Sequence, residues 1–493
     1  MISWTVYVSF IGAMICSLWP KLSPEATRRT ALVSALIGLG ISLLAAVQYD
    51  PSASDSVQFS SRTAWVPALG IGYQFGADGI SITMLVLTGL AAVVGILFSW
   101  DIAHRTREFF AFYLALIGGV YGVFISFDLF LLFVFYEIAI IPKYFLVAIW
   151  GSTRKEYGAM KLVLYSFVGS ALILIGLLAT YIEAGATTFD LLQLINHPFP
   201  QAFQEWVFPV TFVGFAILAG LWPFHTWAPT GHVAAPTGAS MLLAGVVMKL
   251  GAYGALRFPM TLFPMGLAAW REELALLAVI GIVYGATVAL VQRDFKFVIG
   301  YSSVSHMGFV LLGLMATSEV GLSGAVLQMF SHGILASLLF GIVGRMVYTR
   351  THTRDLTELE TMQLAKKLPF AATTFVVAGF AGMGMPGFSG FIAELQVLIG
   401  AWNTFPTFAI LAGFGIVIGV SYTLRAMMKA FFSKEPEFES RNSEPLAPLT
   451  LPEKTGAIVM IATTALIGLY PRLLLDLIVP SLSSPMLKPL ITP

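Results

Sequence analysis

Residues 128–150 read DLFLLFVFYEIAIIPKYFLVAIW, a stretch long enough to cross a lipid bilayer as a single helix. It nevertheless carries Glu137 near its middle and Lys143 six residues further along. A charged side chain at that depth costs several kcal/mol, and it usually faces a bundle interior or a water-filled path rather than lipid. The stretch therefore predicts a membrane helix that turns its charges toward other parts of a protein.

The composition of the whole chain agrees with a membrane protein. Of its 493 residues, 57% are hydrophobic and 11% are charged, which is far from the averages of soluble globular proteins. The net charge of +1 offers no basic surface for nucleic acid. The single cysteine, Cys16, excludes an internal disulfide and a cysteine-based cluster or zinc site. We expect a multi-pass membrane protein without a metal or cofactor of its own.

Apolar windows of bilayer length recur along the whole sequence. We predict about fourteen transmembrane helices in one all-α polytopic membrane domain, residues 1–493, with no soluble domain. The predicted spans are 3–19, 30–47, 79–99, 109–126, 129–149, 161–184, 207–223, 236–257, 273–291, 297–316, 322–346, 370–399, 403–429 and 455–475. The longer joins, 48–78, 185–206, 347–369 and 430–454, are polar and are predicted to be connecting segments.

The distribution of basic residues predicts the orientation. Twenty of the 27 lysine and arginine residues fall in or beside the joins that follow odd-numbered spans, and five fall on the other side. Lys143 and Lys249 are the two that lie inside the membrane. Because lysine and arginine accumulate on the cytoplasmic side, we expect both termini on the periplasmic side of a bacterial plasma (inner) membrane.

Two predicted spans contain residues that interrupt a helix. These stretches are GLWPFHTWAPTGHVAAPTG at 220–238 and GFAGMGMPGFSGFIAE at 379–394. Matched breaks in two halves are typical of inverted-repeat transporters, because irregular backbone at membrane depth must lie inside protein or beside water. Helices 7 and 12 are broken in this way, each as the fourth of a five-helix unit. The predicted divisions are 1–108 (helices 1–3), 109–257 (first inverted repeat, helices 4–8), 273–431 (second, helices 9–13) and 432–493 (last helix and tail).

Polar and ionisable residues inside the spans are the candidate functional residues. They are Glu137, Lys143, Lys249, Lys296, His306, Gln328, His332 and Glu394. Carboxylates, lysines and imidazoles on successive spans suit a proton relay. The alternative is a set of internal ion pairs and hydrogen bonds that fix helix packing. We favour a relay for Glu137 and Lys249, which lie well inside their spans, whereas Lys143 has the alternative of extending to the membrane surface.

Several motifs, taken in order, resemble a known family. They are YEIAIIPKYFLVAIWG, PFHTWAP, APTGASMLLAGVVMKLGAYGALRF, FKFVIGYSSVSHMGFV, the HTRDL of THTRDLTELE, and GMPGFSGFIAEL. Together they are similar to the antiporter-like subunit M (chain 4) of respiratory complex I, the NADH:quinone oxidoreductase, within the proton-conducting membrane transporter family. The resemblance covers nearly the whole chain.

This resemblance implies a function and its partners. The chain is expected to be a proton-translocating subunit of the membrane arm, coupled to quinone reduction elsewhere in the complex. NADH, FMN, iron–sulfur clusters and quinone are implied on other subunits, with no redox centre on this chain. Its implied partners are other membrane-arm subunits, among them neighbouring antiporter-like subunits, together with the lipid bilayer and protons.

The resemblance also implies individual roles. Glu137 takes the place of the span 5 glutamate that modulates its neighbour's charge, Lys249 that of the central span 8 lysine, and Glu394 that of the exit-side carboxylate of span 12. His306 and His332 match polar residues of the family's central hydrophilic axis. Lys143 and Lys296 are further candidates.

One position departs from the family pattern. The family usually has a lysine in span 7, in a stretch like FAxKxPxxPxHxW, whereas FAILAGLWPFHTW places Leu218 there. The usual cation beside Glu137 is therefore absent. Lys143 or a neighbouring subunit is expected to supply it.

Two other functions remain as alternatives. One is the D subunit of a multisubunit sodium/proton antiporter, or a membrane subunit of a related hydrogenase. The other is a structural membrane scaffold that no longer pumps, which Leu218 favours. The HTRDL motif and the glutamate of span 12 favour complex I over the antiporter and hydrogenase subunits. Some proteins related to complex I carry lysine in place of that glutamate.

Overall fold

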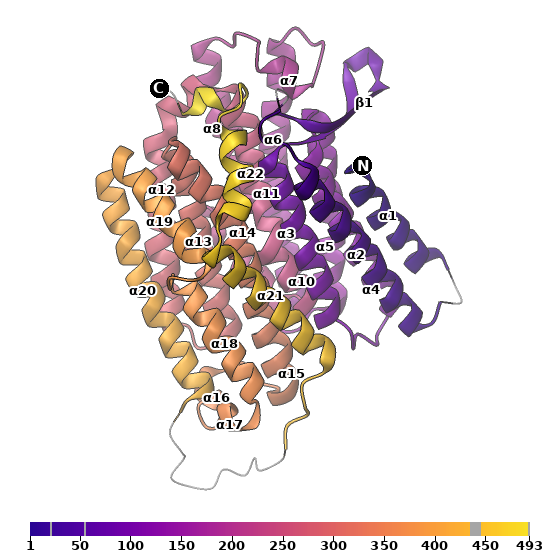
Figure 1. The fold of residues 1–493 in the computed structure, drawn as a ribbon, viewed down its shortest axis with the longest axis vertical. Helices are drawn as coiled ribbons and strands as arrows, with labels where there is room; N and C mark the ends of the chain where they lie inside the picture. Colours follow the sequence, from indigo (N-terminus) through magenta and orange to yellow (C-terminus); the bar gives the residue numbers. More distant parts are fainter. Residues whose placement is uncertain (20–21, 54–55, 434–444, 492–493) are drawn as a thin grey trace.

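Long helices form a bundle that runs along the height of the molecule (Figure 1). The computed structural model describes residues 1–493 apart from 20–21, 54–55, 434–444 and 492–493. Within these ranges, 11 helices are long and apolar enough to cross a membrane, or up to 12 with a bent pair near the C-terminus. Two shorter apolar helices, Ser3–Leu18 and Pro369–Gly382, accompany them. The membrane part is helical as predicted, and the count of fourteen spans stays a prediction.

The first part of the chain alternates long helices with short surface elements. Its elements are α1 (Ser3–Leu18), α2 (Pro24–Gln48), β1 (Gln58–Val66), β2 (Ile71–Ala77), α3 (Gly79–Phe98), α4 (Thr106–Ile125), α5 (Leu129–Trp150), α6 (Lys155–Glu183), α7 (Leu191–Leu194), α8 (Gln201–Ala219), α9 (Trp227–Ala234), α10 (Thr237–Leu242), the π-helical turn η3 (Leu243–Val247), α11 (Met248–Ala255) and the π-helical turn η4 (Leu256–Met260).

The second part has the same character. Its elements are α12 (Pro264–Val291), α13 (Phe295–Met315), α14 (Glu319–Gly341), the π-helical turn η5 (Ile342–Val347), α15 (Tyr348–Thr351), α16 (Leu356–Leu359), α17 (Leu364–Lys367), α18 (Pro369–Gly382), α19 (Ser389–Thr404), α20 (Pro406–Phe431), α21 (Leu451–Leu469) and α22 (Arg472–Leu482).

The two ends of the bundle carry different surface elements. The hairpin of β1 and β2 and the short helix α7 lie at one end, called the upper end, and α15, α16 and α17 lie at the other, the lower end (Figure 1). Both termini lie toward the upper end (Figure 1). The hairpin and α7 fall within joins that were predicted only as connecting segments. Pairing the two strands satisfies backbone groups that a bare loop would leave to water.

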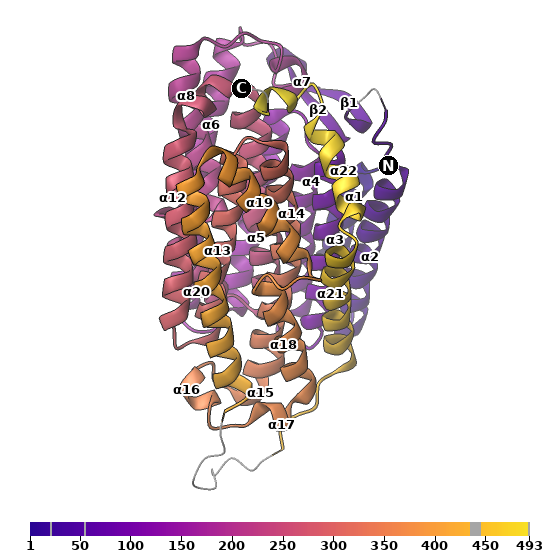
Figure 2. The ribbon, with the colours of Figure 1, turned by 60° about the vertical axis from the view of Figure 1, so that its left-hand side comes forward.

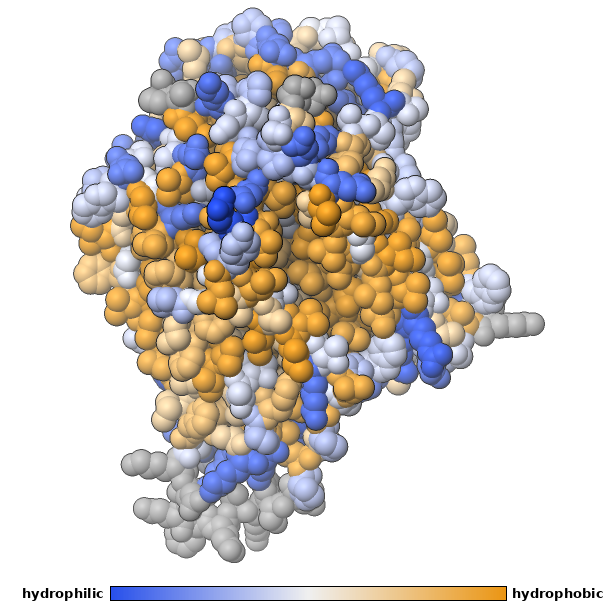
Figure 3. Space-filling view, in the orientation of Figure 1, coloured by the Kyte–Doolittle hydropathy of each residue, from blue (hydrophilic) through white to orange (hydrophobic). Residues whose placement is uncertain are grey.

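The most buried helices form the centre of the bundle. α3, α13, α14 and the segment Thr237–Met260 are almost wholly covered, whereas α2, α6 and α20 expose apolar side chains. Figure 2 shows α13 and α14 between α8 and α12 on one side and α2 and α21 on the other. Apolar residues form a broad belt at mid-height, with hydrophilic residues gathered toward both ends (Figure 3). The covered central helices are the ones that carry Lys249, His306 and His332.

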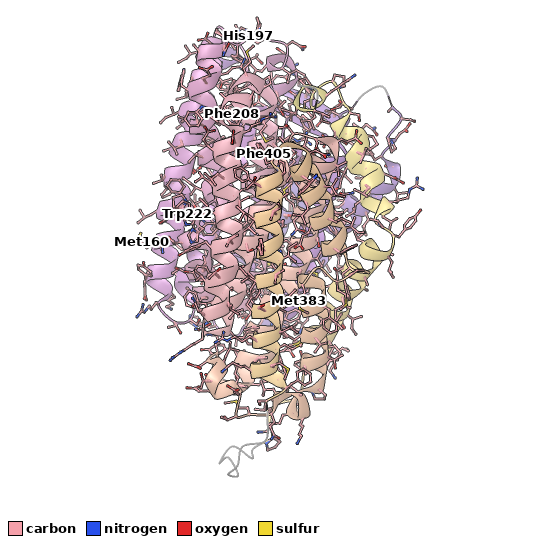
Figure 4. All side chains as sticks on the ribbon, turned by 90° about the vertical axis from the view of Figure 1, so that its left-hand side faces the viewer. Met160, His197, Phe208, Trp222, Met383 and Phe405 are labelled. Carbon is pink, nitrogen blue, oxygen red and sulfur yellow. The ribbon has the colours of Figure 1, made fainter. Side chains whose placement is uncertain are left out.

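Both predicted helix breaks are present. α8 ends at Ala219 and α9 begins at Trp227, while α18 ends at Gly382 and α19 begins at Ser389. A left-handed glycine follows each first half, Gly220 with φ +86° and Gly384 with φ +72°, a conformation that glycine adopts without steric cost. Figure 4 labels Trp222 and Met383, which mark the two breaks in the middle portion of the molecule.

Two aspartate pairs repeat the same local arrangement. Asp128 precedes α5 and forms an antiparallel β-bridge with Asp190, which precedes α7. Asp294 precedes α13 and forms such a bridge with Asp355, which precedes α16. All four aspartates cap their helices by accepting hydrogen bonds from backbone N–H groups. α7 lies at the upper end and α16 at the lower end, so the two arrangements stand at opposite ends of the bundle (Figure 1).

Candidate functional site

Lys249 lies at the centre of the covered helices and is fully buried. Its Nζ is 2.9 Å from Nδ1 of His332 on α14. It also donates a hydrogen bond to the carbonyl oxygen of Ala244, in the π-helical turn η3 just before α11. π-helical turns are frequent at functional sites. The turn and the imidazole together give the ammonium polar partners in a place without lipid or bulk water.

From His332 the contacts continue to a carboxylate. The His332 and His306 rings stack with centroids 5.4 Å apart. His306 Nδ1 lies 3.1 Å from Oε1 of Glu394, and Gln328 Nε2 lies 3.3 Å from the same oxygen. Lys249, His332, His306 and Glu394 thus form one continuous series across α11, α14, α13 and α19, which we call the central row. Lysine, imidazole and carboxylate groups all bind and release protons, so the row has the chemistry of proton transfer.

The second helix break supports the end of this row. An ideal Cβ at Gly384 would stand 3.0 Å from Oε2 of Glu394. The side-chain-free backbone therefore approaches the carboxylate closely. The break that the sequence predicts in span 12 serves to seat Glu394 against the backbone.

A small cavity adjoins the two histidines of the row. Its volume is about 20 Å³, and Ser302, His306, His332, Tyr422 and Thr423 contribute to its lining. Leu335, Ala336 and Leu339 are among the apolar residues that complete the lining. A cavity of this size has room for about one water molecule, for which the imidazole and hydroxyl groups are the available partners. The site can therefore hold a water that bridges imidazole and hydroxyl groups.

Lys296 lies below the central row. It is buried, and its Nζ donates to the carbonyl oxygen of Ala235 at 3.0 Å and lies 3.4 Å from Oγ of Ser240. Ser240 Oγ in turn donates to the carbonyl oxygen of His232 at 2.7 Å. These contacts connect the start of α13 to the stretch between α9 and α10.

His232 is a residue of this region that the sequence interpretation missed. Its ring is fully buried between Trp227 and Phe340, and neither ring nitrogen has a hydrogen-bond partner among the described residues. It lies within electrostatic range of both Lys249 and Lys296. The histidine was present in the quoted stretch 220–238, but it was given no role in the sequence-based prediction.

Glu137 and Lys143 form a separate group against α6. Lys143 is fully buried and its Nζ donates to Ser166 Oγ at 3.0 Å, so the alternative that it extends to the membrane surface is wrong. Glu137 is half-buried, within electrostatic range of Lys143 and beside Ser170. Neither Glu137 Oε1 nor Ser170 Oγ has a well-formed hydrogen bond among the described residues. The two serines are four residues apart and face the two charges from one side of α6.

The structure thus divides the predicted site residues into two sets. Lys249, His306, His332 and Glu394 meet in the central row, and Lys296 approaches it through Ser240. Within the described residues, no hydrogen bond or ion pair joins Glu137 or Lys143 to that row. In the same part of the chain, no group of three or more His, Cys, Asp or Glu side chains is placed to hold a metal ion.

Comparisons with known proteins agree on one family. Residues 126–419 match the family described as NADH:quinone oxidoreductase/Mrp antiporter, TM. The chain is 34% identical to NADH-quinone oxidoreductase subunit M of Rhodobacter capsulatus, over 98% of this chain and 96% of that protein. A chain of respiratory complex I from Thermus thermophilus with bound NADH superposes with a TM-score of 0.90 at 27% identity, covering 99% of this chain and 100% of that one. A chain of the Mrp complex from Dietzia sp. DQ12-45-1b has the same fold, with a TM-score of 0.84, 21% identity and 99% of each chain covered.

Proposed function

The chain belongs to the NADH:quinone oxidoreductase/Mrp antiporter family, and on this basis we propose that it is the proton-translocating subunit M of the membrane arm of an NADH:quinone oxidoreductase. The observation that carries the proposal is the central row, a series of neighbouring proton-binding groups from Lys249 to Glu394 in the covered centre of the bundle. The chain then acts as a translocase within the complex. NADH, FMN, iron–sulfur clusters and quinone belong to other subunits, and adjacent membrane-arm subunits are its partners.

The row transfers protons by coupled titration. Each group in it lies close enough to its neighbour that a proton on one changes the proton affinity of the next. A charge change beside Lys249 therefore favours release toward His332 and His306, and Glu394 receives the proton at the far end. Glu137 and Lys143 are the pair through which an adjoining subunit alters the charge felt by this chain.

The orientation follows from the basic residues. The lower end carries arginines such as Arg345, Arg350 and Arg354, in the joins where lysine and arginine accumulate. Because such residues face the cytoplasm, the lower end is the cytoplasmic side of a bacterial inner membrane and both termini are periplasmic. The two broken helices and the two aspartate bridges support an inverted repeat of helices 4–8 and 9–13.

Replacement of Lys249 tests the relay. Lys249→Ala removes the group that begins the row, so NADH-driven proton pumping should fall to a small fraction while the complex still assembles. Removing a buried charge also removes its desolvation cost, and the folding penalty should be modest. Pumping is measured in inverted vesicles with a pH-sensitive dye, beside the rate of quinone reduction. Lys454→Ala, at an exposed lysine near the start of α21, is the control and should pump normally.

Two alternatives make different predictions in the same experiment. A structural scaffold would tolerate Lys249→Ala, with normal pumping by the assembled complex. A subunit of a sodium/proton antiporter would show cation exchange without NADH, and its gene would lie beside antiporter genes rather than those of other complex I subunits. The likeness to the Mrp complex, at 21% identity, supports the shared fold.

A further inference from the structure

A cleft at the lower end of the molecule leads to Lys296. Its volume is about 180 Å³, which is room for several water molecules. The walls come from the α3–α4 join, the α5–α6 join, the start of α10, the start of α13 and η5. Lys296 contributes to its lining and contacts the Ala235 carbonyl oxygen and Ser240 Oγ. Ser240 Oγ in turn donates to the backbone carbonyl oxygen of His232. The cleft therefore lies between the lower end of the molecule and the residues below the central row, and Lys296 is only 3% exposed.

Two hydroxyl groups in the cleft are placed for water. Ser99 and Ser152 both line it, and neither side-chain oxygen has a hydrogen-bond partner among the described residues. Ser99 is 4% exposed. Buried hydroxyls are normally satisfied by protein or by water. The walls of the cleft are thus suited to a short chain of water molecules that ends at Lys296.

An ion pair spans two of the walls. Asp101, in the α3–α4 join, pairs with Arg345, in the π-helical turn η5. Both residues line the cleft. Gly344, next to Arg345, lies against the stem of Lys296, because a Cβ there would stand 3.1 Å from Lys296 Cε. The segment that carries Arg345 therefore touches the lysine at the inner end of the cleft.

Arg345 also has a second partner. Its Nε donates to Oε1 of Glu453 at 2.6 Å, and Glu453 is held in addition by Arg350 at 2.8 Å. The side chain of Glu453 is 1% exposed, whereas that of Asp101 is 49% exposed. The Glu453 side is fixed and the Asp101 side is accessible to water. If the pair with Asp101 separates, Arg345 remains anchored on Glu453.

We propose that the Asp101–Arg345 ion pair is a gate on the cytoplasmic uptake route of this chain, which runs from the cleft through Lys296 toward His232 and Lys249. The inference rests on the proposed function, since it assigns the lower end to the cytoplasm and the route to protons. A closed gate separates Lys296 from the cytoplasm, and separation of the pair admits water to it. A pump needs such a barrier, because a route open to both sides would dissipate the gradient.

Thiol accessibility tests the gate. Ser99→Cys places a reporter of similar size inside the cleft, in a Cys16→Ser background that leaves this chain no other cysteine. Inverted vesicles of the whole complex are treated with membrane-impermeant methanethiosulfonates, one cationic and one anionic, and modification of the tagged chain is followed by mass. Asp101→Asn and Arg345→Gln should each raise the modification rate with both reagents, by roughly tenfold, because a closed site reacts only through transient opening.

Controls separate the gate from simple electrostatics. Without a gate, Asp101→Asn would slow the cationic reagent and Arg345→Gln would speed it, with the reverse for the anionic reagent. Opposite changes of this kind, or unchanged rates, would overturn the proposal. Glu360→Gln breaks an ion pair with Lys429 at the same end and should leave the reporter's rate unchanged. A cysteine at the exposed Thr357 should react equally fast in all variants.

The assay also keeps the gate distinct from the relay. Labelling requires neither NADH nor quinone. Unchanged modification rates would therefore contradict the gate without affecting the Lys249→Ala result. Normal proton pumping by Lys249→Ala would contradict the relay without changing the modification rates. Arg345→Gln leaves Glu453 paired with Arg350. This variant therefore provides the test if Asp101→Asn does not assemble.

Discussion

The first prediction at the scale of single residues concerns which side chain supplies the positive charge near Glu137. Lys143 is buried against Ser166 and within electrostatic range of Glu137, while Leu218 offers no charge. Lys143→Met would leave the half-buried carboxylate without its nearby cation, and an uncompensated charge inside a membrane span is costly. We expect Lys143→Met and Glu137→Gln to lose comparable large fractions of NADH-driven proton pumping, measured with a pH-sensitive dye in inverted vesicles.

Two further variants complete this test. Leu218→Lys, added to Lys143→Met, should restore part of the pumping by returning a cation to the family's position. Lys155→Met is the control. It also removes a lysine that contacts α5, through the carbonyl oxygen of Ile149, but it leaves Glu137 and Lys143 in place, so it should pump normally. Normal pumping by Lys143→Met would assign the cation to a neighbouring subunit.

A second residue-scale prediction concerns stability. Asp78 and Arg257 form an ion pair in which both side chains are 1% exposed, and Arg257 also lies over the rings of Tyr253 and Phe127. Asp78→Asn would leave the guanidinium charged and unpaired, at a cost of about 3–5 kcal/mol. We expect the assembled complex to dissociate at a clearly lower temperature on native gels. Asp476→Asn, in an exposed pair with Arg472, should have almost no effect.

Single residues also show where sequence reasoning succeeds and where it ends. Lys249 and Glu394 were predictable because an ionisable residue inside an apolar span is costly and therefore conspicuous. The sequence could not predict that His332 and His306 lie between them, because this arrangement depends on how α11, α13, α14 and α19 pack. His232 was not predictable, because its burial depends on how Trp227 and Phe340 pack around its ring, which the local sequence does not reveal.

At the scale of elements, the α18–α19 break yields a prediction with an internal control. Gly384 and Gly387 both have positive φ, +72° and +100°, so alanine at either is strained, by about 1–2 kcal/mol for a left-handed L-residue. Only Gly384 approaches Glu394; nothing lies within 4 Å of a Cβ at Gly387. Gly384→Ala should therefore reduce proton pumping well below that of Gly387→Ala at equal assembly. Equal losses in the vesicle assay would assign the effect to backbone strain.

Elements were predictable to the extent that their signal is local. Helix breaks follow from glycine and proline, and both predicted breaks are present. The predicted span 455–475 is instead two helices, α21 and α22, bent by 65° at Tyr470 and Pro471. Hydropathy continues through that bend, so an apolar window cannot reveal it. The β1–β2 hairpin was missed because strand pairing depends on a partner rather than on composition.

At the scale of the whole molecule, the orientation in the membrane can be measured directly. Ser483 is exposed near the end of α22 and Thr357 is exposed on α16, at the upper and lower ends (Figure 1). Single cysteines there should react with impermeant reagents from opposite faces, Ser483→Cys in right-side-out vesicles and Thr357→Cys in inverted ones. Reaction of both from the same face would contradict the proposed topology. The basic-residue rule predicts this result from sequence, because it requires only the positions of the joins.

The two aspartate bridges bear on the ancestry of the chain. Asp190 follows Asp128 by 62 positions, and Asp355 follows Asp294 by 61. Under the proposed repeat, this near-equal spacing is what tandem duplication of one ancestral segment leaves behind. The duplicated unit has five crossings, and because five is odd, its second copy must begin on the opposite face of the membrane. One ancestral bridge thus came to serve both faces, and no new sequence had to evolve to invert it.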